Sequence, residues 1–411
     1  MIKPGTNLCR VCGQTSHEYF YRSGKHGYQA DMVWNSSSNK FTLAVPEHAD
    51  TQPLMKLIDP EQYSIADFPP NEIQVRVSNE RDAVTMYRSC PYCKQDHEIF
   101  PPDMGKRPCY VIAVIGAVSA GKTAWLGSLN NALDALNKQH YPYRIEPWKL
   151  RGDTAIARST REYENGNTNY FLIIDVKTRE TVAMIYLLDY AGELYRGQKL
   201  NSSESVGKIL LGKSGVGYPG LDAAVFIEPA VDDPLNKDRA GTKDVIEMLE
   251  NMDLRSILRK IPVARVCTFA DKLIEREEER LRRNPGSIPR LTENTFPRTV
   301  YTDVDETGAS TNKSLRRHYT PEAIIRRIGL EDYIAQDIID TCEVGKNLRT
   351  ILAGYNDRFR HFLVQSCDYV PTANDKGIED YRVQFNAADP LIWLLYKLEL
   401  FSPDMLEGGA R

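Results

Sequence analysis

The stretch CYVIAVIGAVSAGKTAWLGSLNNALDALN, residues 109–137, decides the fold. It opens with a short apolar run, Cys109 to Gly116, of the type found in strands that are buried on both faces. Apolar residues at helical spacing follow the next loop, beginning with Trp125 and Leu129. A buried strand, a glycine-containing loop and a helix in this order predict the beginning of an α/β domain.

The loop in this stretch, GAVSAGKT at 116–123, fits the pattern G-x-x-x-x-G-K-[ST] between a strand and a helix. Its glycines permit backbone conformations and close approaches that a Cβ would block. Its N–H groups and the helix N-terminus present partial positive charge to phosphates. Lys122 is expected to reach the β- and γ-phosphates, and the Thr123 hydroxyl to ligate Mg²⁺. The predicted phosphate-binding residues are Gly116, Ser119, Ala120, Gly121, Lys122 and Thr123.

Further apolar, β-rich runs predict the rest of a sheet, at 169–177, 181–190, 222–230, 262–271 and 361–370. Helical patterns lie between them at 242–260 and 271–283. Alternating strands and helices predict a three-layer α/β domain in which a mostly parallel sheet is covered on both faces. The first two of these runs are joined by a connection too short for a crossover helix. We therefore expect one antiparallel strand pair.

The rest of the chain divides into contrasting segments. Residues 1–105 are rich in Tyr, Ser, Asn and Pro and close with a Pro/Gly-rich stretch, which predicts a domain boundary. Residues 106–411 then form the nucleotide-binding domain. Within it we expect a loop and helical insert at 284–358 and a buried closing helix at 386–402.

A carboxylate for magnesium is predicted at Asp189, where the run IYLLDYAGE ends a strand. Nucleotide chemistry needs a Mg²⁺-directed carboxylate at the end of a strand near the phosphate loop. The run DYAG, Asp189 to Gly192, resembles the D-x-x-G element of GTPases, in which the aspartate holds Mg²⁺ through water and the glycine amide senses the γ-phosphate. Ras-like and translation-factor-related GTPases also have the antiparallel strand pair.

By the same resemblance, CTFADKL is expected to recognise the base through Thr268, Asp271 and Lys272, where GTPases carry N/T-K-x-D and the aspartate binds guanine. Phe269 replaces the lysine whose stem normally covers the base, and its ring can stack on guanine instead. Ser366 and Cys367 resemble the S-A element, whose backbone amide meets the guanine carbonyl oxygen.

Residues that respond to the γ-phosphate are expected on either side of Asp189. Thr168 is the first candidate for the threonine that ligates Mg²⁺ in the triphosphate form, with Thr160 and Thr154 as alternatives. Glu193 occupies the position of a water-orienting glutamine, and its negative charge beside a triphosphate is unfavourable. We therefore expect slow intrinsic hydrolysis that needs a partner's arginine or an adjusted Glu193.

Four of the eight cysteines form two C-x-x-C pairs, namely Cys9 with Cys12 and Cys90 with Cys93. Two such knuckles predict a structural zinc site of four thiolates. The gap between them is far longer than in ordinary zinc ribbons, so a long insertion, or a ligand exchanged for His17 or His97, has to be accommodated. A redox dithiol is the alternative. The other cysteines lie in or beside apolar runs and are predicted core residues: Cys109, Cys267, Cys342 and Cys367.

Taken together, the split zinc ribbon, GxxxxGKT, LLDYAGE, T-x-A-D-K and the C-terminal D-P-L-x-W-L-L helix resemble the bacterial double-GTPase family. The resemblance covers most of residues 1–400. It implies a Mg²⁺-dependent GTPase that binds GTP and GDP and acts with a companion GTPase or adaptor protein in a conflict or defence system. Phe269 and Glu193 depart from the usual pattern.

Composition limits the other possibilities. The 411 residues include 52 basic and 56 acidic side chains, for a formal net charge of -4, so charge does not favour nucleic acid as a partner. No apolar run reaches the ~20 residues that span a bilayer, and the N-terminus lacks a secretory signal, so we expect a cytoplasmic protein. Two rivals stay open: a P-loop ATPase or small-molecule kinase, and a nucleotide-binding interaction module with little turnover.

Overall fold

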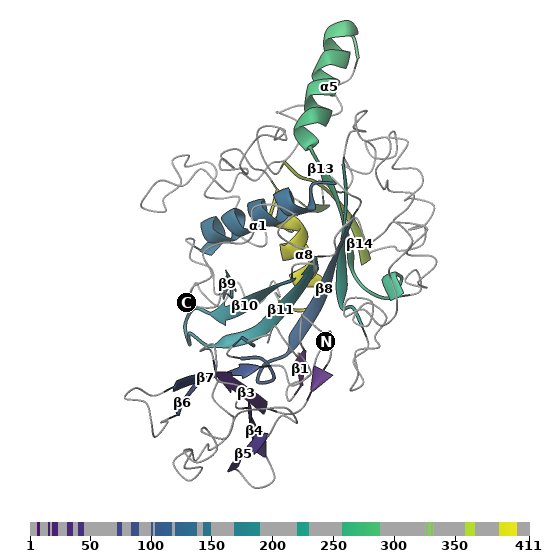
Figure 1. The fold of residues 1–411 in the computed structure, drawn as a ribbon. Helices are drawn as coiled ribbons and strands as arrows, with labels where there is room; N and C mark the ends of the chain where they lie inside the picture. The colour runs from purple at the N-terminus through teal and green to yellow at the C-terminus, as the bar shows by residue number, and fades with distance from the viewer. Residues whose placement is uncertain are drawn as a thin grey trace, which may run out of the picture. The chain divides into compact units, whose positions relative to one another are not determined.

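The computed structural model divides the chain into two compact units, Met1–Tyr110 with Asn201–Gly220 and Val111–Leu200 with Leu221–Arg411 (Figure 1). The residues that it describes are 6–8, 15–16, 19–23, 31–35, 40–44, 72–75, 84–89, 100–101, 103–116, 120–137, 143–148, 168–189, 220–229, 257–287, 325, 328–329, 332, 358–365 and 386–400. No helix in these ranges is long and apolar enough to cross a membrane.

The first unit contains short antiparallel strands. β1 (Asn7–Leu8) and β2 (Thr15–Ser16) form a hairpin. A separate five-stranded sheet has the order β5-β4-β3-β7-β6. Its strands are β3 (Tyr19–Ser23), β4 (Asp31–Asn35), β5 (Lys40–Ala44), β6 (Glu72–Val75) and β7 (Val84–Ser89). The sequence did not predict this sheet, because strands of four to six residues carry too short a pattern.

The predicted zinc ligands Cys9, Cys12, Cys90 and Cys93 lie outside the described residues. In the chain, the first pair falls in the connection from β1 to β2, and Cys90 directly follows β7. Within the described ranges no group of three or more His, Cys, Asp and Glu side chains is placed to hold a metal ion. The zinc site therefore stays a prediction.

A seven-stranded sheet of order β14-β13-β12-β8-β11-β10-β9 forms the centre of the second unit. β8, β12, β13 and β14 run parallel, whereas β10 is antiparallel to both β11 and β9. The bounds are β8 Cys109–Gly116, β9 Tyr143–Pro147, β10 Thr168–Asp175, β11 Thr181–Asp189, β12 Ala223–Pro229, β13 Val263–Thr268 and β14 Phe359–Leu363. The predicted mixed sheet with its antiparallel β10–β11 pair is confirmed.

The tight connection between β10 and β11 follows from local chemistry. The Asp175 Oδ1 atom accepts hydrogen bonds from the backbone N–H groups of Lys177 and Thr178, at 2.7 and 2.9 Å. Arg179 then adopts a left-handed φ of 59°. An aspartate that binds the backbone two and three residues ahead is a typical turn former, so the chain reverses without a crossover helix.

The edge strand β9 was not predicted, because YRIEP is short, charged and contains proline. It is held by the last residue of the preceding helix. Asn137 Nδ2 donates to the Ile145 carbonyl oxygen at 2.8 Å, and Asn137 Oδ1 accepts from the Ile145 N–H at 2.9 Å. One side-chain amide thus bonds the backbone of Ile145 on both its N–H and its C=O, as a neighbouring strand would.

The helices with defined bounds are α1 (Lys122–Asn137), α5 (Ala270–Arg283) and α8 (Asp389–Lys397). α8 lies within the range 386–402 that was expected to hold a closing helix, and its residues Asp389–Leu395 are buried. The ring centroids of Trp393 and of Phe362 on β14 lie 5.9 Å apart. α5 extends away from the carboxyl end of β13 (Figure 1). The predicted helix at 242–260 and the predicted loop and helical insert at 284–358 lie almost entirely outside the described ranges, so the third layer stays a prediction.

Strand residues and the inner side of α1 form the core of this unit. Trp125, Leu129 and Leu133 of α1 are fully buried, as are most residues of the central strands. Cys109 and Cys267 are buried as predicted, whereas Cys342 and Cys367 lie outside the described residues. A continuous apolar core beneath the carboxyl ends of β8, β12 and β13 gives the loops at that edge a rigid base.

Candidate functional site

The G-x-x-x-x-G-K-[ST] loop begins where β8 approaches β12 too closely for a side chain. Gly116 pairs with Ile227, and a Cβ on Gly116 would lie 2.5 Å from the Ile227 carbonyl oxygen. At the other end of the loop, Gly121 has a φ of 85°. Both positions therefore require glycine for geometric reasons.

Lys122 is the first residue of α1 and is 7% exposed. Its Nζ atom donates a hydrogen bond to the Gly116 carbonyl oxygen at 2.7 Å. The side chain consequently folds back across the loop that precedes it. The first turn of α1 contains no acidic residue, so nothing there neutralises the positive end of the helix dipole.

Asp189 ends β11, the strand next to β8. Its Oδ1 atom is buried and has no hydrogen-bond partner within the described part of the chain. Burial raises the pKa of this carboxyl to about 6, although the positive charge of Lys122 acts in the opposite direction. A buried carboxylate oxygen without a partner fits a hard cation such as Mg²⁺, which prefers oxygen ligands.

The two threonines predicted to ligate Mg²⁺ are placed by the backbone only. Thr123 is the second residue of α1. Thr168 is the first residue of β10 and pairs with Leu188, the neighbour of Asp189. The other predicted site residues outside the described side chains are Ser119, Gly192, Glu193, Asp271, Ser366 and Cys367, as are the alternatives Thr154 and Thr160.

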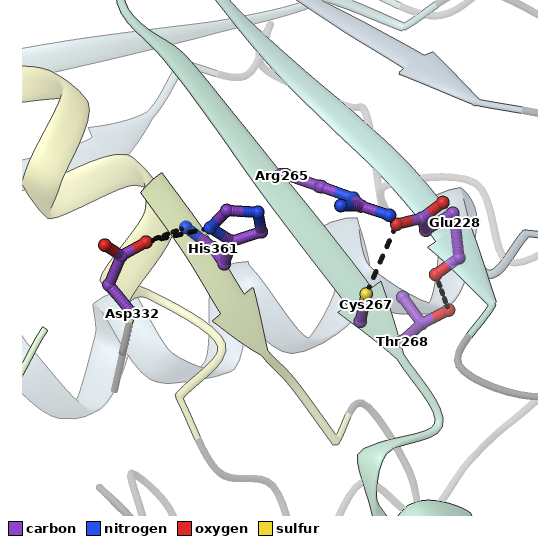
Figure 2. Close-up of polar contacts among 6 residues, drawn as sticks. All are labelled: Glu228, Arg265, Cys267, Thr268, Asp332 and His361. Carbon is purple, nitrogen blue, oxygen red and sulfur yellow. Dashed lines mark hydrogen bonds and ion pairs between the residues drawn. The ribbon is translucent and has the colours of Figure 1, made fainter. Parts of the chain in front are cut away.

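Thr268, at the end of β13, links the loop after β8 to the loop after β13. Its Oγ1 atom donates to the Ala120 carbonyl oxygen at 2.7 Å and lies 3.2 Å from the Glu228 carbonyl oxygen (Figure 2). A Cβ on Gly121 would meet the same hydroxyl at 3.1 Å. A buried threonine therefore fixes the spacing between the predicted phosphate loop and the predicted base loop.

Phe269 follows with a left-handed backbone, at φ 61° and ψ 37°, and caps α5. For a residue with a bulky side chain this conformation costs about 1–2 kcal/mol, and such strain is concentrated at functional sites. The turn places Asp271 in the first turn of α5. Lys272 bonds Glu275 of the same helix, with its Nζ atom 2.9 and 3.0 Å from the two carboxylate oxygens.

Sequence reasoning missed a buried ion pair beside these loops. Arg265 Nε contacts Glu228 Oε1 between β13 and β12, and the Cys267 thiol lies 3.4 Å from the same oxygen (Figure 2). Both charged side chains are almost fully buried. The sequence does hint at the ion pair, because Glu228 and Arg265 are charged residues within the otherwise apolar runs AAVFIEP and VARVCT.

A second polar contact holds β14. The backbone N–H and the Nδ1 atom of His361 lie 2.7 and 2.9 Å from Asp332 Oδ1.

Comparison with known proteins yields no family. No family model matches the chain, and no curated protein matches it. Among solved structures, the G domain of the T. maritima FeoB iron transporter is 12% identical, with a TM-score of 0.21, over 43% of this chain and 83% of that one. The Arl6 BBS3 small GTPase from Trypanosoma brucei is 10% identical, with a TM-score of 0.28, over 72% and 99%.

The GTP-bound Ski7 GTPase-like domain of S. cerevisiae is 11% identical, with a TM-score of 0.32, over 72% of this chain and 51% of that one. The chain therefore spans about half of the length of that structure. Because all three TM-scores are low, any functional assignment depends on the residues of the site itself.

The ionisation of Asp189 makes a prediction for stability. Its raised pKa means that the folded state binds the proton more tightly than the unfolded chain, so ionisation destabilises the fold as the pH rises from about 4 to about 6. The full cost, about 3 kcal/mol, applies above that range. We expect Asp189→Asn to stabilise the ligand-free protein at pH 7.5 by up to about 3 kcal/mol, and progressively less toward pH 4. Urea unfolding at several pH values measures this.

Asp175→Asn is the matched control. A backbone hydrogen bond from Thr178 lowers the pKa of the exposed Asp175 carboxyl, so its ionised form supports the fold above its unfolded pKa. Asp175→Asn should therefore destabilise the protein at pH 7.5. If Asp189→Asn also destabilises it at that pH, the carboxylate is satisfied within the fold.

Proposed function

We propose that the chain binds a guanine nucleotide together with Mg²⁺ and hydrolyses GTP as a molecular switch. One observation carries the proposal. Two buried charged groups lie at the carboxyl ends of the neighbouring strands β8 and β11. Lys122 folds back over the glycine loop, and its positive charge partly offsets the rise that burial causes in the pKa of Asp189, whose Oδ1 atom has no hydrogen-bond partner among the described residues. This combination suits a ligand that brings both anionic phosphate and a divalent cation.

The phosphate chemistry is assigned to the loop and to α1. The backbone N–H groups of the loop and the uncompensated N-terminus of α1 bind phosphate oxygens. Lys122 exchanges the Gly116 carbonyl for β- and γ-phosphate oxygens, and Thr123 and Asp189 are the residues that hold Mg²⁺. Bound Mg²⁺ supplies neutralisation of the charge that develops on the phosphates.

Base recognition is assigned to the turn after β13. Thr268 sets the distance between the phosphate loop and this turn. Asp271 accepts hydrogen bonds from the N–H groups of guanine, and the Phe269 ring stacks on the base. Because an aromatic face stacks on any base, Phe269 leaves discrimination against adenine to Asp271. Because Phe269 stands where GTPases carry a lysine, a P-loop ATPase or small-molecule kinase is the second candidate.

Switching is assigned to the segments around Thr168 and from Asp189 to Tyr195. Ordering of such segments by the γ-phosphate, and their release on hydrolysis, is an established type of switch. The charge of Glu193 disfavours rapid hydrolysis, so a partner's arginine completes the site. The resemblance to bacterial double-GTPases supports a companion GTPase or adaptor in a conflict or defence system as that partner.

Nucleotide selectivity tests the assignment. With fluorescent GDP bound in the presence of Mg²⁺, we expect GTP to displace the probe at concentrations at least 100-fold lower than ATP, because a base edge that loses its hydrogen bonds is rejected strongly. Asp271→Asn should reduce this ratio to near one while phosphate binding persists. Equal displacement by ATP and GTP from the wild-type protein would favour the ATPase or kinase.

Phe269→Gly separates strain from function. Glycine adopts the left-handed conformation without cost, so the nucleotide-free variant should unfold at a higher urea concentration than the wild type. Loss of the ring should nevertheless weaken GTP binding by about fivefold or more, since base stacking contributes about 1–3 kcal/mol. Calorimetric titration gives the affinity. Wild-type affinity in Phe269→Gly would remove Phe269 from the base site.

We also propose that Cys9, Cys12, Cys90 and Cys93 hold a structural zinc ion. Support comes from their chain positions, one pair between the strands of the β1–β2 hairpin and the other directly after β7. Elemental analysis should find about one zinc per chain, lost in Cys90→Ser but kept in Cys109→Ala, whose thiol is in the core. Equal zinc content in Cys90→Ser and the wild type would contradict the site.

A further inference from the structure

Trp125 connects the phosphate loop to the C-terminal segment. It lies in the first turn of α1, where its backbone N–H donates to the Gly121 carbonyl oxygen at 2.8 Å. Its indole Nε1–H donates to the Ala387 carbonyl oxygen at 3.0 Å, across 262 positions of sequence. The ring is fully buried. One residue thus bonds the end of the phosphate loop and the turn that precedes α8, which lies beside α1 (Figure 1).

Asn386 continues this connection to the sheet. It is fully buried and has a left-handed φ of 57°, a conformation that asparagine tolerates better than most residues. Its Nδ2 atom donates to the Leu363 carbonyl oxygen at the end of β14, at 3.2 Å. Its own carbonyl oxygen accepts the Asp389 N–H at 3.2 Å, which begins α8. The turn is therefore shaped so that α8 starts where β14 ends.

The end of β14 in turn holds the predicted base loop. The Val364 N–H donates to the Cys267 carbonyl oxygen at 2.9 Å, and the Ala270 N–H donates to the Val364 carbonyl oxygen at 3.3 Å. These two bonds bracket Thr268 and Phe269. Thr268 then returns to the phosphate loop through its bond to the Ala120 carbonyl oxygen.

The bonds form a closed circuit that runs from the phosphate loop through Trp125, the turn at 386–387, the end of β14 and Thr268 back to the phosphate loop. We propose that Trp125 and Asn386 are positioning residues of the nucleotide site, which hold the phosphate loop and the base loop at the spacing of one bound nucleotide. This inference rests on the proposed function. It makes the turn at 386–387 a part of the nucleotide site, although the residues of this turn do not touch the nucleotide.

The circuit predicts a kinetic effect. A nucleotide bound at both of its ends leaves only when the two loops separate, so each lost bond of the circuit accelerates release. A buried hydrogen bond contributes about fivefold to such an equilibrium. The rate of nucleotide association depends on the loops being open, so we expect this rate to change little. A side chain that only stabilises the fold would lower the melting temperature and leave the release rate of bound nucleotide unaltered.

Two variants remove single bonds with little change of shape. Trp125→Phe keeps a buried aromatic ring and removes the N–H that binds Ala387. Asn386→Gly keeps the left-handed backbone and removes the amide that binds Leu363. Trp393→Phe is the matched control, because Trp393 is equally buried in α8 but lies outside the circuit. All three are made in the full chain and loaded with fluorescent GDP and Mg²⁺.

Stopped-flow measurement of GDP release after addition of excess unlabelled GDP, together with melting temperatures, decides the question. We expect release about fivefold faster in Trp125→Phe and in Asn386→Gly, unchanged association rates, and wild-type release in Trp393→Phe despite its lower melting temperature. Wild-type release in the first two variants, or release rates that follow the melting temperature in all three, would overturn the circuit alone. Failure of the wild-type protein to bind GDP or GTP would instead overturn the proposed function and the circuit with it.

Discussion

The buried carboxylate of Asp189, held within the electrostatic reach of the buried ammonium of Lys122, is the constraint on which the site depends. Desolvation disfavours the charged carboxylate, and the lysine only partly compensates, so its pKa stays raised at about 6. Strongly shifted pKa values of this kind are concentrated at functional sites. A cation bound by Asp189 would satisfy its buried carboxylate oxygen, and a phosphate bound by Lys122 would take the place of the Gly116 carbonyl oxygen as the acceptor for its ammonium.

The elements around this pair explain how it is maintained. Parallel strands β8, β12 and β13 end at one edge of the sheet, and the close contact of β8 with β12 leaves no room for a Cβ on Gly116 beside the Ile227 carbonyl oxygen. The loops that follow are joined by Thr268 rather than left independent. Crevices at the carboxyl ends of parallel strands are the usual ligand sites of open α/β sheets, and here the Thr268 hydroxyl joins the two loops at that edge directly.

Much of this could be predicted from sequence because the signals are local. The apolar run of β8 followed by the glycine loop predicts a buried strand and a helix, and the short connection between β10 and β11 predicts that these two strands are antiparallel. The ion pair of Glu228 with Arg265, the strand β9 and the bond from Trp125 to Ala387 could not be predicted. They depend on contacts between distant segments, and a single charged residue in an apolar run does not show which residue it will pair with. Phe269 was identified by position, but its left-handed backbone was not.

In the proposed function, Lys122 and the Mg²⁺-directed carboxylate of Asp189 act on the γ-phosphate of GTP. Phosphate release from GTP in a single turnover, by wild-type protein and by Lys122→Ala, tests it most directly. We expect slow release by the wild type alone, on the order of 10⁻⁴ to 10⁻² per second, which stops in Lys122→Ala and when Mg²⁺ is chelated. Equal release by Lys122→Ala, or release that is indifferent to Mg²⁺, would contradict it.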